Sequence, residues 1–160
     1  MKTYIRLFGA GPVGVFFTIC FLIPIFWMQK HFYPGSLGIP YPVRLAILFI
    51  AIIFTIAGVI WSFKSLPVDQ RGRGLCTQGA FRWVRHPLYA SFISIGAPGL
   101  AFYLNHWLCF IWVPVLHIIW HLVIRVEEHA MITQFGEKYI EYSKHTGRFI
   151  PRFLYFKRKT

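Results

Sequence analysis

The chain has 160 residues, of which 56% are hydrophobic and 19% aromatic, with a formal net charge of +12 at pH 7. This apolar content exceeds the roughly 45 to 50% of soluble domains, so it excludes an ordinary soluble enzyme and indicates an integral membrane protein of one domain, residues 1–160. The basic residues mostly flank apolar segments and no nucleic-acid-binding motif is visible, so we expect membrane lipids, and no nucleic acid, as their partners.

Four apolar stretches are each near the roughly 20 residues that a membrane-spanning helix requires. They cover about residues 7–28, 43–63, 88–104 and 107–123. The first contains Pro24 and lacks a small-residue cleavage site, so we expect it to be retained as a span. Only Asn105 and His106 separate the last two, which predicts an antiparallel helical hairpin. The predicted fold class is therefore all-α: a polytopic membrane helical bundle with about four transmembrane helices.

The distribution of Lys and Arg predicts the orientation in the membrane. An even number of spans places both termini and the inner loop, residues 64–87, on one side. Fifteen of the 17 Lys and Arg residues fall on that side, and only Lys30 and Arg44 fall on the other. Because short cytoplasmic loops collect basic residues, we expect cytosolic N- and C-termini. So short a chain suits a bacterial inner membrane.

The inner loop has a composition suited to ligand binding. Glycines let backbone N–H groups approach a ligand closely, and arginines can bind a carboxylate. The loop interleaves the two types: Arg71, Gly72, Arg73, Gly74, Gly79, Arg82 and Arg85. No predicted strand precedes the glycines, so they do not form a dinucleotide-binding fingerprint.

The segment after the fourth span, residues 125–160, is predicted to form a cytosolic tail. Its first part, about residues 125–144, reads as one amphipathic helix, with an apolar stripe at Met131, Phe135, Tyr139 and Tyr142. We expect this stripe to pack on the inner loop or on the membrane surface. Gly147 and Pro151 would end the helix, and Phe149, Ile150 and Phe153 would dock against the interface.

The adjacent acids Glu127 and Glu128 are the most unusual feature of the chain, which has only five Asp and Glu residues. They stand where a span meets water, where a charge costs free energy unless it is paired or bound. The predicted hairpin brings them to the same depth as Arg85 and His86. Salt bridges that hold the loop to the hairpin are one interpretation, favoured for Arg85. A ligand site is the other, favoured for the two acids because one acid would suffice for a bridge.

His86 is a further candidate, either as a general base or as a cap of the helix that begins at Pro87. The three cysteines show no paired spacing, so we infer neither a disulfide nor a zinc site.

Several motifs together resemble the C-terminal core of the isoprenylcysteine carboxyl methyltransferase and phospholipid methyltransferase superfamily. They are Arg85-His86-Pro87-Leu88-Tyr89, Glu127-Glu128 with Met131, Phe135-Gly136, Tyr139, Tyr142 and Pro151. The resemblance implies a membrane enzyme that binds S-adenosylmethionine at the cytosolic end of the last hairpin. By position, the cofactor contacts would be Arg73, Gly74, Leu75, Cys76, Phe81, His86, Pro87, Leu88, Tyr89, Glu127 and Glu128. The candidate catalytic residues are Arg85, His86 and Tyr89.

The acceptor would be a lipophilic small molecule or a membrane lipid that enters from the bilayer. Where the similar isoprenylcysteine enzymes carry a substrate-carboxylate arginine, this chain has Val123, which argues against methyl esterification of a prenylated cysteine. NADPH-dependent sterol-type reductases share a similar hairpin, but adjacent Glu127 and Glu128 would repel the phosphates of a dinucleotide. A non-catalytic lipid-binding protein of the same fold is the third alternative.

Overall fold

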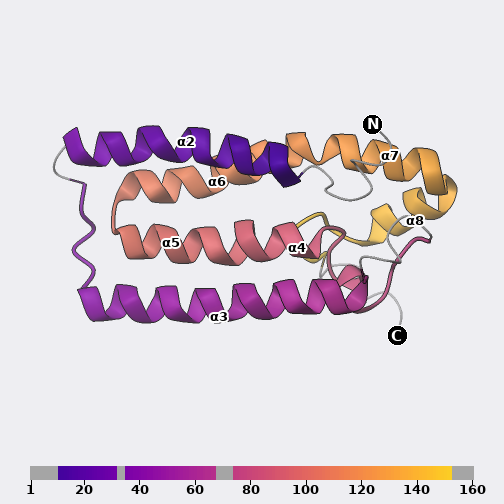
Figure 1. Cartoon of the computed structure of the whole chain (residues 1–160), viewed down its shortest axis with the longest axis horizontal. Helices are drawn as coiled ribbons and strands as arrows, with labels where there is room; N and C mark the ends of the chain where they lie inside the picture. The colour runs from indigo at the N-terminus through magenta and orange to yellow at the C-terminus, as the bar shows by residue number, and fades with distance from the viewer. Residues whose placement is uncertain (1–10, 32–34, 68–73, 153–160) are drawn as a thin grey trace.

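Four apolar helical segments lie side by side in the computed structural model, which describes residues 11–31, 35–67 and 74–152 (Figure 1). They are α2 (Gly11–His31), α3 (Tyr41–Ser65), a third segment made of α4 (Pro87–Ala90), η3 (Ser91–Gly96) and α5 (Ala97–Leu104), and α6 (Trp107–Val123). Each is long and apolar enough to cross a membrane. The predicted all-α membrane bundle is therefore confirmed, and the last three predicted spans match these helices to within two residues at each end.

The four segments form a row in which α2 packs on α6, α6 on α5, and α5 with η3 on α3 (Figure 1). This arrangement leaves large apolar side chains exposed along the helices, among them Phe16, Phe49, Phe54 and Ile118. An apolar surface of this extent is unsuited to water and suits contact with lipid tails. The main buried core lies between the two middle segments and the C-terminal residues, where Ile93 of η3, Trp120 of α6 and Phe149 pack together.

Small residues let α3 approach the third segment closely. Ala51, Thr55 and Ser62 are the buried residues of α3. A Cβ atom built on Gly99 would lie only 2.2 Å from the Cβ of Ala51, so the two backbones are in near contact. Thr55 also donates a buried 3.3 Å hydrogen bond from Oγ1 to the carbonyl oxygen of Ser91. Such small-residue contacts are typical of helix pairs in membranes, where close packing replaces the hydrophobic driving force.

Replacing Gly99 with valine is expected to lower the stability of the protein by about 1 to 3 kcal/mol, the usual effect of overpacking. The new side chain would force α3 away from α5 at Ala51. The thermal unfolding midpoint in detergent measures the effect. Gly74→Val is the matched control, because a Cβ at Gly74 meets nothing within 4 Å. Equal midpoints for the two variants would show that this contact does not hold the helices together.

A π-helical turn, η3, which was not predicted from the sequence, interrupts the third segment. The turn is followed by Pro98 in the first turn of α5. Proline has no backbone N–H, so it cannot close the α-helical bond to the carbonyl of Ser94. The wider π register accommodates this missing donor. Turns of this kind occur frequently at functional sites.

The predicted hairpin turn at Asn105 and His106 is confirmed. Asn105 adopts a left-handed conformation with φ 56° and ends α5, and His106 caps α6 by accepting a hydrogen bond from the N–H of Leu108. The segment that leads into α3 is attached to this turn, because the carbonyl oxygen of Asn105 accepts from the N–H of Leu37 at 3.2 Å and its side chain donates to Ser36 Oγ at 2.8 Å.

Helical structure in the tail is confirmed, but the prediction of one continuous helix is wrong. α7 (Arg125–Phe135) ends at Gly136, and α8 (Glu137–His145) follows as a separate helix. Gly136 has φ 55°, a conformation that residues with a Cβ rarely adopt. The predicted apolar stripe is therefore divided between two helices. Its second half carries Tyr139, which is only 2% exposed and packs inward at the end of the bundle.

Candidate functional site

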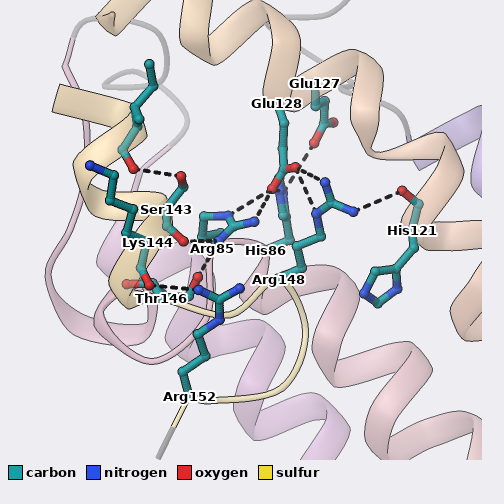
Figure 2. Close-up of polar contacts among 11 residues, drawn as sticks. Arg85, His86, His121, Glu127, Glu128, Ser143, Lys144, Thr146, Arg148 and Arg152 are labelled. Carbon is teal, nitrogen blue, oxygen red and sulfur yellow. Dashed lines mark hydrogen bonds and ion pairs between the residues drawn. The ribbon is translucent and has the colours of Figure 1, made fainter. Parts of the chain in front are cut away.

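Three segments distant in the sequence meet at the end of the bundle where α3 ends and α4 begins (Figure 1). Figure 2 shows the polar side chains that they bring together. α7 continues α6 after Ile124 and carries Glu127 and Glu128 in its first turn. Arg85 and His86 precede α4, and their backbone N–H groups donate to the carbonyl oxygens of Gly147 and Arg148 at 2.8 and 3.1 Å. Residues 147 and 148 thus bind the segment that carries Arg85 and His86, and these residues form one polar cluster with Glu127 and Glu128.

Glu128 is bound by two arginines. Its Oε1 accepts hydrogen bonds from Nε and Nη2 of Arg85 at 2.8 and 2.6 Å. Its Oε2 accepts from Nε of Arg148 at 2.8 Å, and Nη2 of Arg148 lies 2.5 Å away. Arg85 also donates from Nη1 to the carbonyl oxygens of Ser143 and Thr146. Glu128 and Arg85 are 8% and 9% exposed, so this is a buried ion pair. It links α7 to the start of α4 and, through the carbonyl contacts of Arg85, to residues 143 and 146.

Glu127 instead faces His86 and Tyr89, the other two residues that were predicted to be catalytic. Its Oε1 accepts a 3.0 Å hydrogen bond from the hydroxyl of Tyr89, and its Oε2 lies 3.4 Å from Nδ1 of His86. The His86 ring therefore stands between the two acids, with Nε2 3.6 Å from Oε1 of Glu128. That distance brings the ring beside the carboxylate but is too long for a hydrogen bond.

Two buried polar atoms beside the ion pair have no hydrogen-bond partner among the residues that the structure describes. They are Nε2 of His86 and the hydroxyl oxygen of Tyr139. Each side chain faces a charged group of the cluster, Glu128 for His86 and Arg85 for Tyr139, and each of the two atoms can still hydrogen-bond water or a ligand.

The inner loop lies at the same end, but the described contacts of its predicted residues lead to α3 and α8. Gly74 is exposed and Leu75 half-buried, and Cys76 Sγ lies 3.4 Å from the carbonyl oxygen of Ser65. The carbonyl of Phe81 accepts a hydrogen bond from Tyr142, and burial raises the pKa of the Tyr142 phenol, which keeps it protonated as a donor. Pro87 and Leu88 form the start of α4. Arg73 lies outside the described residues.

Three residues near this cluster were not predicted from the sequence: Arg148 and two histidines of α6, His117 and His121. Arg148 is 20 residues from Glu128, and no spacing rule pairs residues across two helices and a loop. The histidines had a signal, since two ionisable residues one turn apart within an apolar span are rare. The Phe149 ring packs against them, with its centroid 4.9 Å from that of His121.

The fold and the cluster define a polytopic α-helical membrane protein with a polar site at one end of its spanning helices. A family model, that of the isoprenylcysteine carboxyl methyltransferase (ICMT) family, matches residues 39–133, more than half of the chain, and the chain belongs to this family. The match includes Arg85 to Tyr89 and both acids but ends before Arg148. Family membership implies an integral membrane methyltransferase. A search of curated proteins finds no match.

Proposed function

We propose that the protein transfers a methyl group from S-adenosylmethionine to a lipophilic or membrane-lipid acceptor. The observation that carries this proposal is the convergence of Tyr89, His86 and Glu127 from two helices into one contact set. Family membership supports the reaction type. The residues, and not a resemblance alone, support this end of the bundle as the cofactor site.

The side chains present suit a cationic, hydroxyl-rich cofactor. Glu127 offers a carboxylate to an ammonium group or to ribose hydroxyls. His86 Nε2 and the Tyr139 hydroxyl are buried hydrogen-bonding atoms that such a ligand would satisfy. S-adenosylmethionine, when bound, supplies an electrophilic methyl group. The protein then needs chiefly to hold the reactants in line and at close range, with little acid or base assistance.

The roles within the cluster follow from its contacts. Tyr89, with its hydroxyl on Glu127 and its ring 4.7 Å from that of Trp120, positions the carboxylate from the core side. Arg85, which was predicted to be catalytic, is engaged with Glu128 and two carbonyls, so we assign it a positioning role. His86 lies between both acids and orients them toward the site.

The proposed orientation places this site at the cytosolic face, with both termini on that side. Lys64, Arg82, Arg125, Lys138 and Lys144 lie on helices or loops at the site end, whereas Lys30 and Arg44 lie at the other end. The excess of basic residues near the site supports a cytosolic position. A water-soluble cofactor would enter from this side and a lipophilic acceptor from the bilayer. A bacterial inner membrane remains our proposal for the compartment.

Titration of the purified full chain in detergent with S-adenosylmethionine and, separately, with NADPH tests the proposal. Isothermal calorimetry is expected to show saturable binding of S-adenosylmethionine and none of NADPH. Binding of NADPH alone would support a reductase. Binding of neither ligand would overturn both enzymatic functions and leave a lipid-binding protein of the same fold.

A further inference from the structure

His117 and His121 stand one turn apart on α6, inside the membrane-spanning part of the chain. Leu116 and Trp120 belong to the buried face of this helix, at 2% and 4% exposed, whereas Ile118 is 62% exposed on the lipid face. The two histidines are half-buried at the boundary between these faces. Ionisable side chains in a span are costly, so they mark a functional site by default.

The hydrogen bonding of His121 determines which of its ring nitrogens can bind a ligand. Nδ1 lies 2.8 Å from the carbonyl oxygen of His117, and a carbonyl can only accept, so Nδ1 carries the proton. In the neutral imidazole, Nε2 then carries a lone pair and acts as an acceptor. Within residues 11–31, 35–67 and 74–152, no hydrogen bond reaches Nε2 of His121. This atom is therefore available to a hydrogen-bond donor.

The π-helical turn faces the same edge of α6. The His117 ring interacts with the backbone of Ile93 in η3, and Ser94 of the same turn donates a 3.5 Å hydrogen bond to the carbonyl of Phe149. Polar groups thus gather between η3 and α6 at a depth where most neighbours are apolar. The π register, which displaces carbonyls from the α-helical pattern, is what makes this edge polar.

Phe149 connects this edge to the proposed cofactor site. Its ring centroid lies 6.0 Å from that of His86 on one side and 4.9 Å from that of His121 on the other. The histidine edge is therefore one aromatic side chain away from the Glu127 contact set, on the membrane side. A lipophilic molecule with its head group at His121 would approach the donor site from the bilayer.

We propose that the His117–His121 edge of α6 binds the head group of the methyl acceptor, and that this head group is a neutral hydroxyl or thiol. The inference rests on the proposed function and names its substrate class. An O–H or S–H group donates to the lone pair on Nε2 of His121. The same lone pair is placed to hold the proton that such a group loses when it is methylated.

Charged head groups fit this edge less well. A carboxylate has no hydrogen to donate, and Val123, at the position where the similar isoprenylcysteine enzymes carry an arginine, packs against the apolar core. An ammonium group would be repelled by Arg148, whose Nη1 lies 3.4 Å from the carbonyl oxygen of His121. Transfer of an uncharged head group into the bilayer also avoids the cost of burying an ion.

Photo-crosslinking with three C16 probes tests the inference on the full chain in detergent. The probes carry a diazirine near the head group and differ only there: a primary alcohol, its methyl ether and a primary amine. Mass spectrometry locates the crosslinks. One hydrogen bond predicts about fivefold more capture of the alcohol than of the ether by peptides that contain residues 91–96 or 117–124. The His121→Leu variant is expected to reduce capture of the alcohol to the level of the ether.

His129→Gln, an exposed histidine on α7, is the matched control and should leave capture of the alcohol unchanged. Equal capture of alcohol and ether by the unmodified chain would overturn the inference without reference to any variant. Preferential capture of the amine would overturn the head-group class. S-adenosylmethionine affinity, measured by calorimetry on the same samples, should be unchanged in His121→Leu. If the unmodified chain did not bind S-adenosylmethionine, the proposed function would be contradicted. The crosslinking would still report whether the His117–His121 edge binds the head group.

Discussion

Replacing Glu127 with glutamine is expected to weaken S-adenosylmethionine binding by at least about tenfold while the protein stays folded. The substitution keeps the shape of the side chain and its hydrogen bond with Tyr89 but removes the negative charge. A hydrogen bond to a charged group contributes about 1.5 to 3 kcal/mol, which corresponds to a factor of about 10 to 150 in affinity. Calorimetric titration in detergent measures the loss.

Glu137→Gln serves as the control for Glu127→Gln, because Glu137 is an exposed acid in the first turn of α8. Its affinity for S-adenosylmethionine should equal that of the unmodified chain. The thermal unfolding midpoint of Glu127→Gln should also be close to that of the unmodified chain, since the two arginine ion pairs belong to Glu128 and glutamine keeps an acceptor for the Tyr89 hydroxyl. Full affinity in Glu127→Gln would remove Glu127 from the cofactor site.

Helix positions were predictable because hydrophobicity over a span is a strong, local signal. The segment Trp107–Val123 was predicted with the bounds that α6 has, and the Asn105–His106 turn follows from two polar residues between apolar runs. Backbone register was not predictable in the same way. The π turn depends on Pro98 and on packing against α3, and the break at Gly136 depends on one glycine within an otherwise helical pattern.

In the site too, the features set by local sequence were predictable and those set by long-range contacts were not. Hairpin topology correctly placed Arg85 and His86 beside Glu127 and Glu128, since both motifs follow from where spans end. Hairpin topology did not predict that Glu127 and Glu128 have different contacts. The distinction comes from Arg148, which reaches Glu128 from the tail and leaves Tyr89 and His86 against Glu127. Adjacent residues on a helix point about 100° apart, so neighbours in sequence can serve different roles.

The largest loss of stability is expected from replacing Glu128 with glutamine. Breaking a buried ion pair by removing one charge typically costs about 3 to 5 kcal/mol, because the partner remains buried and uncompensated. Here two partners, Arg85 and Arg148, would both lose their carboxylate. Because these arginines connect α4 and the tail to α7, unfolding should begin at this end of the bundle. A lower thermal midpoint and faster hydrogen exchange of the amides of residues 139–149 would show it.

Glu141→Gln is the matched control for stability, because Glu141 pairs with Lys144 and His145 on the exposed surface of α8. An exposed pair in water contributes little, so no change in the midpoint is expected. Glu128→Gln would then weaken cofactor binding only indirectly, by loosening the segment that carries His86. A variant with an unchanged midpoint and unchanged exchange, but no affinity for S-adenosylmethionine, would instead show that Glu128 contacts the cofactor itself. The two acids are thus separable by experiment: Glu127 through ligand affinity at constant stability, and Glu128 through stability first.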